Sequence, residues 1–191
     1  MPPLLHLLII DDSKDDAWLL WHNLKRGGYD VEYEVVDSAE GMRASLADKK
    51  WDLITSDHAM PRFSAPAALA LARELCPEVP FIIVSGEIDL NLAVSLMRAG
   101  ADDYVQKREL ALLVPAVQRV LSKTNSRRAA KQLEEAFRAS EMRYRRLFET
   151  AKDGILILNA ATSEVVDVNP FLQEMLGYAH ADIVGKKLWD I

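Results

Sequence analysis

The sequence predicts a doubly wound α/β domain on a five-stranded parallel sheet, followed by a long helix and a small α+β segment. Three observations carry this prediction. Short apolar runs alternate strictly with longer amphipathic stretches over residues 1–121. Two of the runs are almost continuously apolar, as expected of strands buried on both faces. Turn motifs such as "RGGYD" and "RAGADD" separate the units.

The predicted strands are short runs of mainly aliphatic residues. They are LLHLLII, VEYEVV, DLITS, FIIVS and DYVQ, at residues 4–10, 31–36, 52–56, 81–85 and 103–106. The second run alternates apolar and charged side chains, so we expect it nearer an edge of the sheet. The amphipathic stretches that follow the strands predict helices at residues 15–26, 39–48, 65–75, 89–98 and 109–121.

The first helix has a clear start, which explains only part of an acidic cluster. Ser13 can cap the first turn, and Asp15 and Asp16 complement its unpaired N–H groups and the helix dipole. Asp11 and Asp12 precede this cap, at the end of an apolar strand. A buried carboxylate is costly unless it is paired, hydrogen-bonded or bound to a metal. These two residues therefore need another explanation.

The helical pattern continues well beyond residue 121. Pro115 lies inside it, so we expect either a kink or a later helix start. An imperfect heptad seam follows, formed by Ala130, Leu133, Phe137, Ser140, Tyr144, Leu147 and Ala151. It is out of phase with the apolar positions of the preceding segment, which indicates a kink or a change of winding near "KTNSRR". The seam predicts a parallel two-stranded coiled coil and hence a homodimer.

Composition and charge narrow the range of functions. Residues 1–121 carry 12 Lys+Arg and 19 Asp+Glu, which argues against nucleic-acid binding by this part. Residues 122–149 carry 8 Lys+Arg and 4 Glu, and we interpret them as a solvated helix face. A lone cysteine, Cys76, excludes an internal disulfide and fits a reducing compartment. The first apolar run is too short for a membrane span, so we expect a cytoplasmic protein without membrane contact.

Polar residues follow the ends of four predicted strands. Asp11 and Asp12 end the first strand, Asp57 follows the third, Ser85 ends the fourth and Lys107 follows the fifth. In a doubly wound sheet, ligands bind beyond the carboxyl ends of the strands, so we expect these side chains to converge.

Clustered carboxylates repel one another and favour a cation. Oxygen ligands without His or Cys indicate Mg²⁺, with Mn²⁺ as a possible substitute. A phosphate-like group is then the expected ligand, because Lys107 can act as a point charge on its oxygens and the Ser85 hydroxyl can donate a hydrogen bond to one of them. One carboxylate is left to attack phosphorus as a nucleophile and form an acyl phosphate.

At this point the sequence resembles the receiver domains of two-component response regulators. The matching residues are the pair Asp11–Asp12, Asp57 followed by "HAMP", Ser85 before Gly86, and Lys107 after "DYVQ". The resemblance covers residues 4 to about 121. It implies a flavodoxin-like fold for the first domain.

The resemblance also implies a role for each matching residue. Asp57 would be the phosphoacceptor. Asp12 and Asp57 would ligate Mg²⁺ together with the backbone carbonyl of Ala59, and Asp11 would act through metal-bound water. The phosphoryl-binding and switch residues would be Ser85, Lys107 and Tyr104.

Two further positions and one departure follow from the same resemblance. Ala59 and Glu87 match positions that tune hydrolysis of the phosphoryl group in the family. Family members usually have a proline after the lysine, often in a cis bond, whereas Arg108 follows Lys107 here.

The remainder of the chain resembles the first half of a PAS sensory domain. "DGILILN" and "VVDVNP" match its first two strands, and "LGY" matches its following helix. We therefore expect a receiver domain at 1–124, a helical linker at 125–150 and a partial PAS segment at 151–191. The ligand of the PAS segment and the final output are not predicted.

The leading hypothesis is a signalling switch rather than a turnover enzyme. A histidine kinase or phosphotransfer protein would supply the phosphoryl group to Asp57, and the linker would relay the change to the PAS region. One alternative is a degenerate receiver that serves as a docking scaffold. Another is a Mg²⁺-dependent phosphohydrolase with Asp57 as nucleophile, although such enzymes typically have a second aspartate where Ala59 stands.

Overall fold

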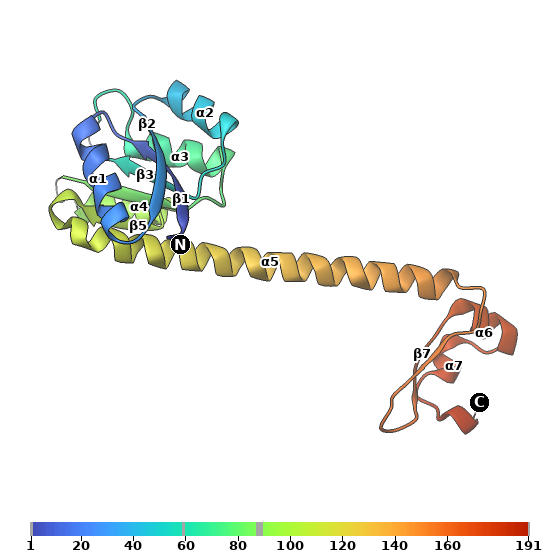
Figure 1. Ribbon diagram of the computed structural model, residues 1–191. Helices are drawn as coiled ribbons and strands as arrows, with labels where there is room; N and C mark the ends of the chain where they lie inside the picture. The colour runs from blue at the N-terminus through green and yellow to red at the C-terminus, as the bar shows by residue number, and fades with distance from the viewer. Residues whose placement is uncertain (1, 59, 87–89, 191) are drawn as a thin grey trace. The chain divides into compact units, whose positions relative to one another are not determined.

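The computed structural model describes residues 2–58, 60–86 and 90–190 of the chain. It contains two compact units, Met1–Arg128 and Ala129–Ile191, and one long helix contributes to both (Figure 1).

The first unit is built on a five-stranded parallel sheet, as far as the described residues show. Its strands are β1 (Leu4–Ile10), β2 (Asp30–Val36), β3 (Leu53–Asp57), β4 (Phe81–Ser85) and β5 (Asp103–Gln106). The strand order is β2-β1-β3-β4-β5. The predicted fold class is therefore confirmed, and β2 lies at an edge as its alternating pattern predicts.

Four helices connect the strands. They are α1 (Lys14–Arg26), α2 (Ala39–Asp48), α3 (Ala65–Leu75) and α4 (Leu90–Arg98). Serine side chains cap the first three helices, because Ser13, Ser38 and Ser64 each accept a hydrogen bond from a backbone N–H in the first turn. The sequence signals for the start of α1 are thus satisfied as predicted.

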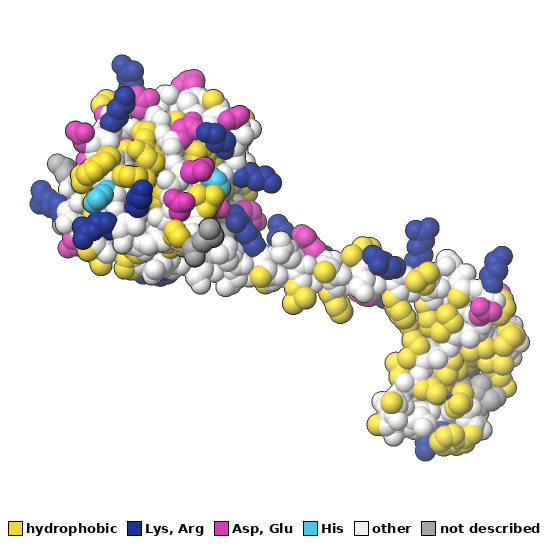
Figure 2. Space-filling model, viewed as in Figure 1, with side chains coloured by type: hydrophobic (Ala, Val, Ile, Leu, Met, Phe, Trp, Pro, Cys, Tyr) yellow, Lys and Arg dark blue, Asp and Glu magenta, His cyan; other side chains and the backbone are white. Residues whose placement is uncertain are grey.

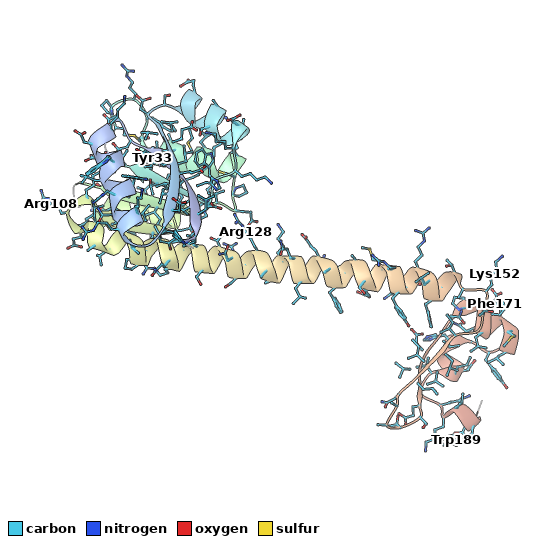
Figure 3. All side chains as sticks on the ribbon, viewed as in Figure 1. Tyr33, Arg108, Arg128, Lys152, Phe171 and Trp189 are labelled. Atoms are coloured by element: carbon cyan, nitrogen blue, oxygen red, sulfur yellow. The ribbon has the colours of Figure 1, made fainter. Side chains whose placement is uncertain are left out.

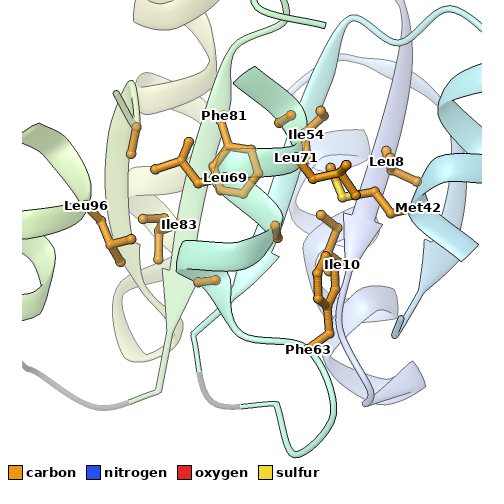
Figure 4. Close-up of a cluster of buried hydrophobic side chains, with 14 of the residues drawn as sticks. Leu8, Ile10, Met42, Ile54, Phe63, Leu69, Leu71, Phe81, Ile83 and Leu96 are labelled. Atoms are coloured by element: carbon orange, nitrogen blue, oxygen red, sulfur yellow. The ribbon is translucent and has the colours of Figure 1, made fainter. Parts of the chain in front are cut away.

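The sheet buries apolar side chains on both faces because it lies between two helical layers. Leu8 and Ile10 of β1 face a cluster that includes residues of α2, α3 and α4 (Figure 4). Leu7 and Ile9 alternate to the opposite face and pack with residues of α1 and the following helix α5. This arrangement explains why the first strand reads as a continuous apolar run.

The helix after β5 begins later than its pattern alone predicts. A 3-10 turn, Lys107–Leu112, includes the non-helical residue Glu109, and α5 then runs over Leu113–Thr150. Pro115 lies in the first turn of α5, where its missing N–H leaves no hydrogen bond unmade. The later start is therefore the correct one of the two expectations, and no break in α5 accompanies the change of seam near residues 123–128.

One close approach fixes the position of the beginning of α5 in the first unit. A Cβ placed on Gly27, which follows α1, would lie 2.4 Å from a methyl group of Val114. Only glycine lets the end of α1 approach α5 this closely without a shift.

The second unit combines the last part of α5 with a small antiparallel ribbon. Strands β6 (Leu156–Leu158) and β7 (Val165–Val168) pair, and α6 (Pro170–Leu176), α7 (His180–Ile183) and the 3-10 turn Leu188–Asp190 follow. The buried Asn169 side chain accepts from Leu172 N and Ile155 N and donates to Asp153 O. It therefore caps α6 and fixes the strand beside it. This hairpin followed by helices agrees with the predicted α+β segment.

The burial of apolar side chains on both faces of the sheet gives a direct prediction about stability. Phe81 is fully buried in the cluster of Figure 4, so Phe81→Ala should lower the free energy of unfolding by about 3–5 kcal/mol through lost burial and the cavity left behind. Urea unfolding followed by tryptophan fluorescence measures the change. Leu75→Ala, at a side chain that is 46% exposed on α3, is the control and should change stability by less than about 0.5 kcal/mol. Equal losses in the two variants would contradict this packing.

Candidate functional site

Three aspartates converge at the carboxyl ends of β1 and β3. The helices that follow these two neighbouring strands pass to opposite faces of the sheet. Asp11 and Asp12 follow β1, and Asp57 ends the neighbouring strand β3. One carboxylate oxygen from each lies within 4.8 Å of the others. The convergence predicted from the strand ends is therefore present for these three residues, at the switch point where doubly wound sheets bind ligands.

The backbone around Asp11 explains why its carboxylate points into this cluster. Its N–H still belongs to the sheet and donates to Val36 O at 3.0 Å, while its carboxylate accepts from Ser13 N at 2.8 Å. Asp11 is only 2% exposed. Burial raises the pKa of Asp11, although the Ser13 N–H and Lys107 act in the opposite direction. A buried carboxylate of this kind gains strongly from a cation.

Lys107 supplies a positive charge to the cluster from the end of β5. Its Nζ lies 3.0 Å from Asp11 Oδ2 and 3.1 Å from Asp57 Oδ2. Burial alone would lower the pKa of Lys107, but hydrogen bonds to Asp16 and Asp11 and the charges of Asp11 and Asp57 raise it above its ordinary value. Lys107 therefore keeps its positive charge over the whole neutral range.

Asp16 also contacts Lys107, which the sequence analysis did not anticipate. Asp16 Oδ2 lies 2.6 Å from Lys107 Nζ. The sequence assigned Asp16 only to the first turn of α1, and this local role is also present, because its N–H donates to Ser13 Oγ. No local signal could have revealed a partner 91 positions away.

Two of the other predicted site residues, Ser85 and Tyr104, lie in the described part of the chain. Ser85 is buried at the end of β4, one residue beyond Val84, which is the register partner of Asp57. Tyr104 is half-buried and packs against the core on the α2–α4 side of the sheet. Ala59 and Glu87 lie outside the described residues, so their proposed roles remain predictions.

The cluster is open to solvent on one side. Asp12 is exposed and lines a pocket of about 300 Å³ together with Asp37, Met60, Pro61 and Arg62. Arg108, which replaces the usual proline, extends into solvent (Figure 3). The described backbone contains no cis peptide bond, so the bond between Lys107 and Arg108 is trans.

The donor set of the cluster suits a hard divalent cation. Its side-chain atoms are all carboxylate oxygens from Asp11, Asp12 and Asp57, and no sulfur or imidazole is part of the group found among the described residues. Mg²⁺ is usually held by one or two carboxylates, and waters or phosphate oxygens complete its shell. The open side at Asp12 leaves space for such ligands.

The fold and this edge of the sheet define a class of protein, the signalling receiver domains. A family model described as "Response regulator receiver domain" matches residues 7–118, and the chain therefore belongs to the response regulator receiver family. A second model, described as a PAS domain, matches residues 142–191. The expected combination of a receiver domain and a PAS segment with a helix between them is thus confirmed.

Curated relatives support a place in two-component signalling. The transcriptional regulatory protein PrrA of Mycobacterium tuberculosis is 31% identical over 121 residues, which are 63% of this chain and 51% of PrrA. The DNA-binding transcriptional regulator NtrC of Salmonella typhimurium is 30% identical over 115 residues, which are 60% of this chain and 24% of NtrC. The matches therefore span about half of PrrA and a quarter of NtrC.

Solved structures show the same fold. NtrX from Brucella abortus, crystallised in complex with ADP, superposes with a TM-score of 0.62 at 26% identity and covers 68% of this chain and 30% of its own. A response regulator receiver domain protein from Clostridium thermocellum gives a TM-score of 0.56 at 25% identity. The match covers 63% of this chain and 97% of the Clostridium chain. Among the described helices, none combines the length and apolarity required to cross a bilayer.

The carboxylate cluster predicts stabilisation by Mg²⁺. At a free Mg²⁺ concentration of 100 times its dissociation constant, the free energy of unfolding should rise by about 2.7 kcal/mol, because only the folded chain assembles the cluster. Thermal unfolding with Mg²⁺ and with EDTA measures this difference. Asp12→Asn should abolish it without disturbing the ion pairs of Lys107, which involve other aspartates.

The matched control for this prediction is Asp48→Asn, at an exposed position on α2. This variant should respond to Mg²⁺ as the wild type does. An equal response of Asp12→Asn and the wild type would show that the cation binds elsewhere.

Proposed function

We propose that the first unit is a phosphoacceptor switch in which Asp57 takes a phosphoryl group from a phosphohistidine. The observation that carries this proposal is the placement of Asp57 beside both Lys107 Nζ and the oxygens of Asp11 and Asp12. The donor is a histidine kinase or a phosphotransfer protein, in keeping with the family of the chain. The P–N bond of the donor breaks as a P–O bond to an Asp57 carboxylate oxygen forms.

Each residue at the site has a proposed task in this reaction. Asp12 and Asp57 would hold Mg²⁺ together with the Ala59 carbonyl, and Asp11 would act through a bound water. The ion supplies charge neutralisation for the phosphoryl group and the attacking carboxylate. Lys107 and Ser85 bind phosphoryl oxygens. Because these two side chains are already in position, the reaction avoids the reorganisation of solvent that it would need in water.

The orientation of Asp57 is compatible with this role. Its Oδ1 accepts from His58 N at 2.7 Å, whereas its Oδ2 is the oxygen that contacts Lys107. Asp57 is 9% exposed, so it is largely buried but still in contact with solvent. The pocket that Asp12 lines is the proposed entry for a small phosphodonor.

Relay from the switch depends on bistable elements near the phosphoryl group. In this proposal Tyr104 and Ser85 change conformation with phosphorylation, Ala59 and Glu87 set the hydrolysis rate, and α5 carries the change toward the PAS segment. The protein acts in the cytoplasm, and its domains divide at 1–124, 125–150 and 151–191. The domain phosphorylates and dephosphorylates itself and performs no further turnover reaction.

Replacing the acceptor tests the proposal. Incubation of the full chain with acetyl phosphate and Mg²⁺ should add the mass of one phosphoryl group, and intact-protein mass spectrometry detects it. Asp57→Asn should add none, because an amide is not a nucleophile toward phosphorus. EDTA should suppress the adduct in the wild type.

The absence of an adduct from the wild type under every metal condition would contradict the switch. It would favour a docking scaffold in its place. Continuous release of phosphate from many phosphate esters would instead favour a phosphohydrolase.

We also propose that the chain forms a parallel homodimer along the seam of α5. The large apolar residues of the seam in the second unit are exposed, with Leu133 at 73%, Phe137 at 68% and Leu147 at 66%. Exposed apolar side chains at heptad spacing are typical of a surface that a second helix covers. Figure 2 shows apolar side chains along this part of α5.

A charge placed in the seam should separate the subunits. The double variant Leu133→Glu and Phe137→Glu should be monomeric in light scattering at concentrations where the wild type is dimeric, because buried like charges repel. Met142 provides a matched control, since it is as exposed as Phe137, at 68%, but lies on the opposite side of the helix from the seam. Met142→Glu should remain dimeric, and one mass for all three proteins would refute the interface.

A further inference from the structure

The ion pair between Asp16 and Lys107 has no task in the reaction described above. Its Oδ2–Nζ distance of 2.6 Å is the shortest of the three contacts that Lys107 makes with carboxylates. Asp16 lies in the first turn of α1, and Lys107 follows β5. The pair therefore connects the two elements that border the carboxylate cluster on this side.

Asp16 differs from the other two carboxylate partners of Lys107 because it does not belong to the carboxylate cluster. An ammonium group has three N–H donors, and Lys107 has three carboxylate partners, Asp11, Asp57 and Asp16. Asp11 and Asp57 also belong to the carboxylate cluster that suits a cation. Asp16 is the partner of Lys107 outside that cluster.

The backbone of Asp16 is fixed by the helix and does not depend on Lys107. Its N–H donates to the capping Ser13 Oγ, and the adjacent Ala17 N–H donates to Ser13 O at 3.1 Å. Ala17 and Leu20 bury the inner face of α1 against the sheet. A carboxylate on such a rigid support can hold a flexible lysine side chain in one place.

We propose that Asp16 is a positioning residue that holds the Lys107 ammonium beside Asp57, ready to bind the incoming phosphoryl group. This inference rests on the proposed phosphoacceptor function. As the phosphoryl group reaches Asp57, the N–H that faces Asp57 turns to a phosphoryl oxygen, and the N–H that faces Asp16 stays in place. Lys107 then contributes without first having to be ordered, which is the benefit of preorganisation.

A simpler role for Asp16, as an acidic residue that stabilises the start of α1, is also open to test. Asp15 has the same charge in the same turn and complements the dipole equally. It is exposed, and the described structure gives it no ion pair. Asp15→Asn therefore removes the same charge one position away and leaves Lys107 untouched.

The experiment measures the rate of phosphorylation by acetyl phosphate for the 191-residue wild type, Asp16→Asn and Asp15→Asn at saturating Mg²⁺. Asp16→Asn should lower the maximal rate roughly tenfold, the usual scale for removing a partner that orients a functional group, with little change in the half-saturating concentration. Asp15→Asn should stay within about twofold, because surface charges distant from the reacting atoms contribute little.

A second readout separates positioning from a structural role. The Nζ resonance of Lys107, assigned by its loss in Lys107→Met, should move in the ¹⁵N spectrum of Asp16→Asn but not of Asp15→Asn. Unchanged rates in Asp16→Asn would overturn the inference, as would slower rates with an unchanged Lys107 resonance. Failure of the wild type itself to accept a phosphoryl group would instead contradict the proposed function, while the resonance would still report the contact.

Discussion

Repulsion among carboxylates at the end of the sheet is the constraint on which the site of this protein depends. Asp11, Asp12 and Asp57 bring ligand oxygens within 4.8 Å of one another, and Asp11 is almost completely buried. Such a group is stable only with positive charge close by. Lys107 supplies one charge at 3.0–3.1 Å from two of the aspartates, and the remaining negative charge attracts a cation. The same imbalance that would destabilise a purely structural core makes this edge of the sheet suitable for a divalent cation.

The fold satisfies this constraint through its connectivity. β1 and β3 are neighbours in the sheet although α1, β2 and α2 separate them along the chain, so their carboxyl ends bring the aspartates together. Two apolar layers hold the strands rigid, and the cap at Ser13 directs α1 away from the cluster at a defined point. α5 begins in the first unit and continues into the second.

The parts that the sequence predicts are those set by local pattern and strand ends. Apolar periodicity placed β1 and β4 at their observed bounds, and a parallel sheet then puts Asp11 and Asp57 at the same edge. The contact of Asp16 with Lys107 could not be predicted, because Asp16 already had a sufficient local explanation in the helix cap. The start of α5 was ambiguous for a similar reason, since Pro115 fits either a kink or a first turn. The structure shows the first turn, after a 3-10 turn that contains the non-helical residue Glu109.

The proposed switch requires that Asp57, and not another carboxylate of the cluster, carries the phosphoryl group. Reduction of the phosphorylated protein with borohydride converts an aspartyl phosphate to homoserine, and peptide mapping then locates the modified residue. We expect homoserine at position 57 alone, with a yield that depends on Mg²⁺ and falls when Lys107 is replaced. Homoserine at position 11 or 12, or a phosphoryl group that survives on His58, would contradict it.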